Sequence, residues 1–139
     1  MYLVDTNVIS EARKGRTADA GVRTFFHEAD LARATLYLSV ITVGELHRGI
    51  ELIRYRGDAA QTAVLEGWLE GILADFSRNI LPIDHDAARL WGHLRVPHPE
   101  NEIDKLLAAT AMLHGLTLVT RNVKHVQNTG VRILNPFSH

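Results

Sequence analysis

Three acidic residues occur at positions from which their carboxylates could act together. Asp5 follows the short apolar segment 2–4, Glu45 lies soon after the segment 36–40, and Asp104 stands near the start of an apolar helical stretch. Carboxylates gathered at one place repel one another, which raises their pKa values unless a divalent cation neutralises them. Oxygen ligands of this kind favour Mg²⁺ or Mn²⁺, which activate water for attack on phosphodiesters. The three acids are therefore candidate metal ligands of a phosphodiester-cleaving site.

Each of these acids also has a local structural explanation. Asp5 and Asp84 both stand between an apolar segment and a helix, where aspartate often caps the helix. Thr42 and Glu45 have the spacing of a capping box, in which two side chains satisfy the first N–H groups of a helix. Asp104 could be an exposed first-turn acid that the helix dipole favours. These alternatives stay open while each residue is considered alone.

The apolar segments predict strands, and the periodic segments between them predict helices. Strands are expected at 2–4, 36–40, 79–83, 116–120 and 131–134. Helices are expected at 8–14, 18–29, 42–55, 86–94 and 103–114, with a further long helix that Asp58 caps. Strands that alternate with helices form a mostly parallel sheet covered on both faces, and ligands bind beyond the carboxyl ends of its strands. Asp5 and Glu45 are expected at that edge of the sheet.

The composition is that of an ordinary globular protein. The chain has 139 residues, of which 46% are hydrophobic and 22% charged, and it has no cysteine. Cysteine-ligated zinc and disulfide scaffolds are thereby excluded. No signal peptide or membrane helix is apparent, so a cytoplasmic location is expected. The net charge of −1 argues against nucleic-acid binding through general basicity, so clustered arginines or bound cations would have to help.

Four segments, taken in their order and spacing, resemble a known family. They are YLVDTNVIS (2–10), SVITVGELHRGIE (39–51), EIDKLLAATAMLHGLTLVTRN (102–122) and GVRILNP (130–136). Together they resemble the PIN-domain ribonucleases, in particular the VapC-type toxins of prokaryotic toxin–antitoxin pairs and their FitB-like branch. The resemblance implies an α/β fold, a three-layer α/β/α sandwich formed by residues 1–139 as a single PIN domain.

The resemblance also implies an activity and partners. The activity is endoribonuclease cleavage that depends on Mg²⁺ or Mn²⁺ and leaves 5′-phosphate and 3′-hydroxyl ends. The partners are the RNA substrate and a small VapB-like or FitA-like antitoxin whose tail blocks the site. Contact with DNA is expected only through that antitoxin, and the toxin itself is expected to form a homodimer.

The family motif assigns roles to residues of this chain. Asp5 and Asp104 would hold the metal most directly, and Glu45 would bind it through water or position the attacking water. The family often has a fourth acid after the strand expected at 116–120. Here Asn122 stands in that place, and His125 stands where many relatives have a further acid. Asn122 is expected to orient the outer shell of the site by hydrogen bonds, without adding negative charge.

Other polar residues are weaker candidates. Thr6 and Asn7 could support Asp5, and Thr120 could hydrogen-bond a water at the metal. Arg48 follows Glu45 by three residues on a helix, so it could pair with that acid or contact a phosphate. Turn, capping, strand and surface roles are the open alternatives for these residues.

Two other functions are considered. A phosphatase-like hydrolase with Asp5 as its nucleophile would want a second acid two residues later, where Asn7 stands. A catalytically weak PIN domain that mainly binds antitoxin or RNA is the remaining alternative, because the fourth acid is missing.

Overall fold

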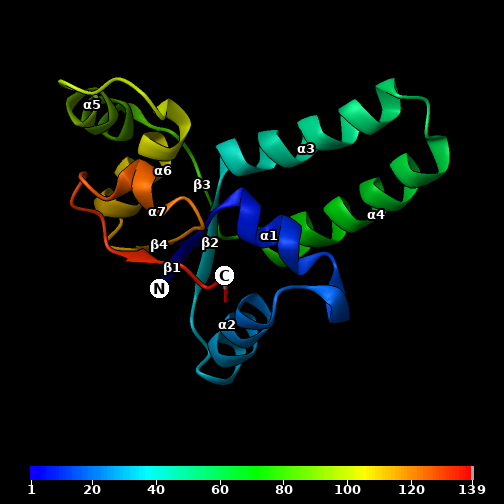
Figure 1. Ribbon diagram of the computed structural model, residues 1–139. Coiled ribbons are helices and arrows are strands. Elements are labelled where there is room, and N and C mark those ends of the chain that lie inside the picture. Colours follow the sequence, from blue (N-terminus) through cyan, green and yellow to red (C-terminus); the bar gives the residue numbers. More distant parts are fainter. Residues whose placement is uncertain (139) are drawn as a thin grey trace.

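A five-stranded parallel sheet forms the centre of the computed structural model, which describes residues 1–138 (Figure 1). The strands are β1 (Tyr2–Val4), β2 (Leu36–Ser39), β3 (Ile80–Leu81), β4 (Thr117–Val119) and β5 (Ile133–Leu134). They lie in the order β3-β2-β1-β4-β5, and all four neighbouring pairs are parallel. The prediction of a mostly parallel sheet is therefore confirmed. The central position of β1 brings its carboxyl end between those of β2 and β4.

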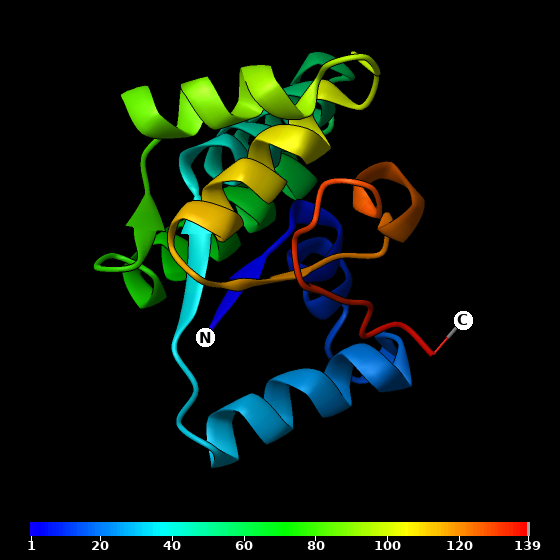
Figure 2. The same ribbon diagram turned by 90° about the vertical axis from the view of Figure 1, so that its left-hand side faces the viewer.

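Helices connect the strands and cover the sheet. They are α1 (Thr6–Ala12), α2 (Ala20–Leu31), α3 (Val40–Tyr55), α4 (Ala59–Asp75), α5 (His85–Leu94), α6 (Glu102–Leu113) and α7 (Val123–Val126), with a short 3-10 helix at Gly15–Thr17. Helices α3 and α4 form an antiparallel hairpin, and α5 packs beside α6 (Figures 1 and 2). Within residues 1–138, no helix combines the length and the apolar character needed to cross a bilayer.

Successive residues of each strand point to opposite faces of the sheet, and each face has its own core. Val4 and Val119 pack with apolar side chains of α1 to α4 on one face. Leu3 and Leu118 pack with side chains of α6 and α7 on the other. This two-residue alternation follows from the pleat of a strand. The sheet is thus buried on both faces, which confirms the expected α/β/α sandwich.

The structure corrects the proposed capping box at the start of α3. Ser39 is the N-cap, and its hydroxyl accepts a hydrogen bond from the backbone N–H of Ile41 at 3.1 Å. Thr42 therefore lies inside the helix, and its buried hydroxyl has no hydrogen-bond partner among the described residues. Glu45 lies about one turn beyond the expected position. The capping explanation of Glu45 is wrong, because the helix begins earlier than its apolar pattern indicated.

Other boundaries differ for local reasons. The strand expected at 79–83 is reduced to Ile80–Leu81, because Pro82 has no N–H to donate to the ladder. Asp84 then caps α5 by accepting from Ala87 N at 2.9 Å, as its capping interpretation predicted. Asp58 caps α4 through the N–H of Gln61, which is also confirmed. Helix α7 and the 3-10 helix were not predicted, because neither is long enough to show an apolar period.

The last described residues are hydrogen-bonded to and packed against the start of α2. Ser138 donates to the Asp19 carboxylate from its hydroxyl at 2.6 Å and from its backbone N–H at 3.0 Å. These hydrogen bonds lower the pKa of Asp19 to about 2. Gly21 lies so close to the carbonyl oxygen of Pro136 that a Cβ atom would collide with it. The segment after β5 therefore requires glycine at this position of α2.

Candidate active site

Asp5 stands at the carboxyl end of the central strand, where the sheet turns into α1. Its backbone N–H donates to Val119 of β4 at 2.9 Å, which continues the ladder for one more residue. Its Oδ1 atom accepts the N–H of Thr6 at 2.7 Å, so Asp5 is also the N-cap of α1. The residue is only 4% exposed. The capping interpretation is therefore correct for Asp5 but incomplete, because a second oxygen remains.

That second oxygen, Oδ2, is held by two polar side chains. The hydroxyl of Thr120 donates to it at 2.7 Å, and the amide of Asn7 donates to it at 3.2 Å. Both residues come from the sheet edge, Thr120 directly after β4 and Asn7 from the first turn of α1. The support expected from Asn7 is confirmed. Thr120 contacts the carboxylate directly, a contact that the sequence did not suggest.

The electrostatic state of Asp5 shows which charges face it. Its pKa is raised from the ordinary value of 3.8 to about 6, first of all by burial and then by the charges of Asp104 and Glu45. The hydrogen bonds from Thr120 and the N–H of Thr6 act in the opposite direction and lower the pKa. Burial and repulsion prevail over these hydrogen bonds. The fold thus brings three acids from distant parts of the sequence within electrostatic reach of one another.

Glu45 extends from the exposed side of α3 toward the start of α1. Its Oε1 atom accepts a hydrogen bond from the hydroxyl of Thr6 at 2.6 Å. Thr6 therefore links two acids, since its N–H binds Asp5 and its hydroxyl binds Glu45. Arg48 is exposed on α3, and the hydrogen-bond partner of Glu45 is Thr6 instead. Of the alternatives left open for Arg48, the structure shows an exposed surface residue and no pairing with Glu45.

Asp104 lies in the first turn of α6 and faces the short helix α7. Its side chain is 19% exposed, so it is not the fully solvated first-turn acid of the local explanation. The Nδ1 atom of His125 lies 2.6 Å from its Oδ2 atom. His125, which stands where many relatives have a further acid, therefore contacts one of the three candidate acids directly. Helix α7, which the sequence did not predict, is what carries His125 to this position.

Asn122 takes part through its backbone. Its N–H donates to the hydroxyl of Thr120 at 3.0 Å, and that hydroxyl donates to Asp5. Asn122 also precedes α7 but makes no capping hydrogen bond with its side chain. Through this backbone hydrogen bond Asn122 supports Thr120 and, through it, Asp5, while the orienting role of the Asn122 side chain stays a prediction. The backbone hydrogen bond does not depend on the residue type at position 122.

A cavity of about 510 Å³ opens between two of the acids. It is lined by Glu45, Pro99, Glu100, Asn101, Glu102, Ile103 and Asp104. Four of these residues are acidic, while Asp5 is buried and does not line the cavity. An open cavity with this lining attracts cations, because the summed negative charges create a local potential.

The acids fit a hard divalent cation in their chemistry but are not drawn together into a ligand set. Carboxylate oxygens are the ligands that Mg²⁺ and Mn²⁺ prefer. Within residues 1–138, however, no group of three or more His, Cys, Asp or Glu side chains lies close enough to hold one ion. Glu45 accepts a hydrogen bond from Thr6, and Asp104 contacts His125, so each of these two acids has a different protein partner. Glu45 is exposed, so its side chain can change rotamer without repacking the core.

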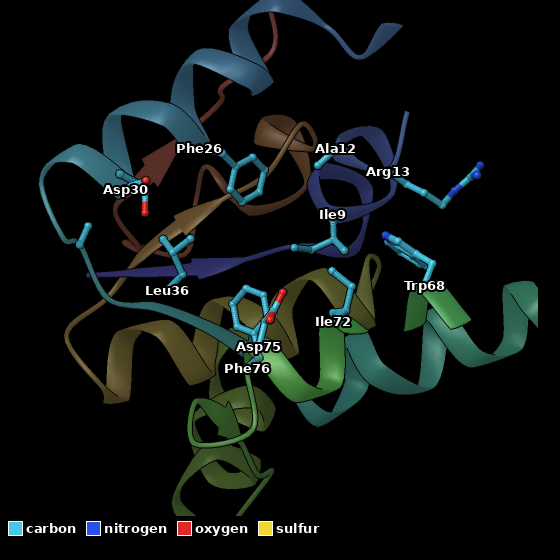
Figure 3. Close-up of a pocket in the computed structure, with 12 residues that line it drawn as sticks. Ile9, Ala12, Arg13, Phe26, Asp30, Leu36, Trp68, Ile72, Asp75 and Phe76 are labelled. Carbon is cyan, nitrogen blue, oxygen red and sulfur yellow. The ribbon is translucent and has the colours of Figure 1, made fainter. Parts of the chain in front are cut away.

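A second cavity, of about 450 Å³, was missed by the sequence reasoning (Figure 3). It lies between α1, α2, α4 and β2, and most of its lining is apolar. A neighbouring cavity of about 260 Å³ shares Arg13 and Trp68 with it and extends to Glu45. Trp68, Ile72 and Phe76 recur at helical spacing in the sequence, which identified an apolar face of α4 without showing that part of it is uncovered.

Known proteins share this fold and about a third of this sequence. Residues 2–129 match the PIN domain family. A protein of Sinorhizobium fredii named VapC ribonuclease Y4jK is 33% identical over 143 residues, which cover 99% of this chain and 98% of the relative. Toxin FitB of Neisseria gonorrhoeae is 34% identical, with 99% of each chain covered.

Solved structures agree with these relatives. The crystal structure of FitAcB from Neisseria gonorrhoeae superposes with a TM-score of 0.85 at 34% identity and covers 98% of both chains. A structure of FitAB bound to a DNA fragment also gives a TM-score of 0.85, at 32% identity, and covers 98% of this chain and 95% of the other.

Proposed function

The chain belongs to the PIN domain family and to its VapC/FitB-like group, and we propose that it is a metal-dependent endoribonuclease toxin. The observation that carries the proposal is the buried Asp5 carboxylate, whose pKa is raised to about 6 by burial and by two facing acids. In the described part of the chain, no Lys or Arg forms an ion pair with Asp5, Glu45 or Asp104. Acids that face one another without a lysine or arginine partner suit a site whose cation comes from solution.

We assign the metal-holding role to Asp5 and Asp104, with Glu45 as the third acid. A bound Mg²⁺ or Mn²⁺ supplies an activated water and stabilises charge on the phosphodiester. Thr120 and Asn7 fix the orientation of Asp5 through their hydrogen bonds to Oδ2. The exposed Glu45 is suited to orient the attacking water and to take up its proton.

Cleavage assays on designed variants test this proposal. Asp5→Asn, Glu45→Gln and Asp104→Asn should each remove most cleavage of unstructured RNA in Mg²⁺ or Mn²⁺, and EDTA should abolish cleavage by the unmodified protein. Asp84→Asn is the matched control, because Asp84 also follows a strand and caps a helix but lies outside the site. Wild-type rates in the three site variants, with a folded circular-dichroism spectrum, would exclude the assignment.

A second function is favoured by one observation. His125 holds Asp104, and no three-ligand group is assembled within residues 1–138. A chain with such a site could act mainly by binding an antitoxin or RNA, with weak catalysis. This candidate predicts RNA binding without detectable cleavage over a range of Mn²⁺ concentrations. Cleavage that requires Asp104 would rule it out.

We also propose a small antitoxin partner of the FitA or VapB type, with DNA contacted only through it. The support comes from relatives, since the similar FitAB structure holds a DNA fragment. The apolar cavities that meet at Arg13 and Trp68 also support it, because they lead from α2 to Glu45. Trp68→Ala should weaken a complex purified from cells that carry the native operon. Trp91→Ala is the control, as Trp91 lies in neither cavity. Purification of the chain without any small partner would contradict the proposal.

The homodimer stays a prediction from the family resemblance. Light scattering of the purified chain measures its mass directly. A mass of one 15.5 kDa chain at micromolar concentration would contradict the prediction.

A further inference from the structure

A small cavity with a different charge adjoins the acidic one. Its volume is about 180 Å³, and it shares Glu100 and Asn101 with the acidic cavity. The chain has only three lysines, and two of them, Lys105 and Lys124, line this cavity. His98 and His125 line it as well. Cationic side chains are thus concentrated beside the site at which the acids gather.

Lys105 is an unusual residue in this cavity because it is only 6% exposed. Its Nζ atom donates to the backbone carbonyl of His98, which occupies one of its three N–H donors. A buried ammonium group is costly unless it is paired with an anion or fully hydrogen-bonded. The described residues include no ion pair made by Lys105 or Lys124. The cavity therefore offers two lysine ammonium groups, neither of which is in an ion pair.

One acid of the lining reduces this positive charge. Glu100 lies 3.7 Å from His98, and its side chain is exposed. With two lysines against one carboxylate, the local balance stays positive. The loop that forms the wall is also held in place, since Arg95 donates to the carbonyl of Pro99 at 3.1 Å. The cavity is therefore formed in advance by the fold.

In α6 and α7, adjacent residues face different parts of this region, with the acid on one side and the lysines on the other. In α6, Asp104 lines the acidic cavity and the next residue, Lys105, lines the basic one. In α7, His125 contacts Asp104 while Lys124 also lines the basic cavity. The basic cavity therefore directly adjoins the cavity at which the acids lie.

We propose that this basic cavity binds a backbone phosphate of the RNA strand, next to the bond that is cut. The inference rests on the ribonuclease function proposed above and adds the place where the strand is held. A chain with a net charge of −1 and an acidic centre lacks general attraction for RNA, so binding requires local cations. Lys105 and Lys124 supply them next to the centre. A phosphate there would also complete the hydrogen bonding of Lys105.

Binding of RNA at several salt concentrations tests the proposal. Full-length protein that carries Asp5→Asn is used in EDTA, so that a fluorescent, unstructured oligoribonucleotide stays intact. Lys124→Gln should weaken binding by about tenfold or more at low salt, the loss expected for one charge-assisted hydrogen bond. The slope of log K against log salt should fall by about 0.7, the value for one phosphate contact to a single strand. Lys14→Gln is the control, because Lys14 pairs with Glu11 away from both cavities.

The second variant is Lys105→Met, which keeps the apolar stem of the buried lysine and removes its charge. Its melting temperature is measured alongside its RNA affinity.

In the cleavage-competent chain, Lys124→Gln should raise KM with kcat unchanged, because it removes binding that is equal in the ground and transition states.

Three results would overturn the inference. One is an affinity and a salt slope for Lys124→Gln that match those of Lys14→Gln. The second is the absence of measurable RNA binding by the Asp5→Asn chain. The third is loss of a co-purified protein partner in Lys124→Gln with unchanged RNA binding, which would assign the cavity to an acidic peptide. The ribonuclease proposal is tested by a separate experiment, in which the unmodified chain is incubated with RNA and Mn²⁺. RNA that stays uncut there would contradict that proposal and not the phosphate site.

Discussion

Asp5→Asn should make the metal-free protein more stable at neutral pH, although it removes a hydrogen-bonded side chain. The pKa of Asp5 is about 6 in the folded protein, against 3.8 ordinarily. At about 1.4 kcal/mol for each pKa unit, the ionised carboxylate costs the folded state about 3 kcal/mol at pH 7. Asparagine avoids this cost but cannot accept both hydrogen bonds that Oδ2 receives, at roughly 1 kcal/mol each. The expected net gain is therefore about 1–2 kcal/mol.

The pH dependence of this gain follows from the direction of the pKa change. Between pH 3.8 and about 6 the folded protein keeps the Asp5 proton and the unfolded chain has lost it. The free energy of unfolding therefore falls as the pH rises through this window and levels off above it. Because the asparagine side chain cannot ionise, the advantage of the Asp5→Asn variant should shrink by about 2 kcal/mol between pH 7.5 and pH 4.5.

Urea unfolding in EDTA at both pH values measures this difference. Asp84→Asn, which replaces an aspartate cap outside the site, should change the free energy of unfolding by less than about 0.5 kcal/mol, because asparagine caps a helix equally well. The reasoning is refuted if Asp5→Asn is less stable than the unmodified chain at pH 7.5. It is also refuted if the difference between the two chains is the same at both pH values.

The remaining predictions concern the metal, the fourth position and the C-terminal segment. Mg²⁺ or Mn²⁺ at roughly 100 times Kd should raise the melting temperature by about 5 to 15 °C, and Asp104→Asn should reduce this rise. An unchanged melting curve would argue against a metal site. Asn122→Asp should strengthen Mn²⁺ binding measured by calorimetry, because added charge raises affinity for a hard cation, and equal or weaker binding would exclude a charge deficit. His125→Ala should also strengthen Mn²⁺ binding, since it releases Asp104 from its 2.6 Å contact, and weaker binding would show that histidine supports the site. Gly21→Ala should lower the melting temperature by several degrees, because its Cβ would collide with the carbonyl of Pro136, and an unchanged melting temperature would contradict that packing.

The sequence predicted the sheet well because its strands are buried on both faces. Segments such as Tyr2–Val4 and Leu36–Ser39 are short, apolar and bounded by polar residues, so their pattern identifies them. Their alternation with helices then predicted that the strands run parallel. The start of α3 was misplaced because Ser39 lies within the apolar strand pattern, although its hydroxyl is the cap.

The site was predicted in part for a similar reason. Residues that follow strands can be located from the sequence, which explains why Asp5, Thr120 and Asn7 were all found. Their mutual contacts depend on side-chain geometry, which residue spacing does not contain. His125 illustrates this, because its contact with Asp104 depends on α7, a helix of four residues. The basic cavity was missed because Lys105 looks like an exposed helical residue in the sequence, yet it is buried.

The most direct test of the metal-dependent ribonuclease is the chemistry of the RNA ends. Unstructured RNA is incubated with the purified chain at increasing Mn²⁺ concentrations, with Asp104→Asn and Asp84→Asn as site variant and control. The account predicts fragments with 5′-phosphate and 3′-hydroxyl ends that appear only with Mn²⁺, at equal rates for the unmodified chain and Asp84→Asn, and not for Asp104→Asn. Cleavage that persists in EDTA, or that Asp104→Asn performs at the unmodified rate, would contradict it.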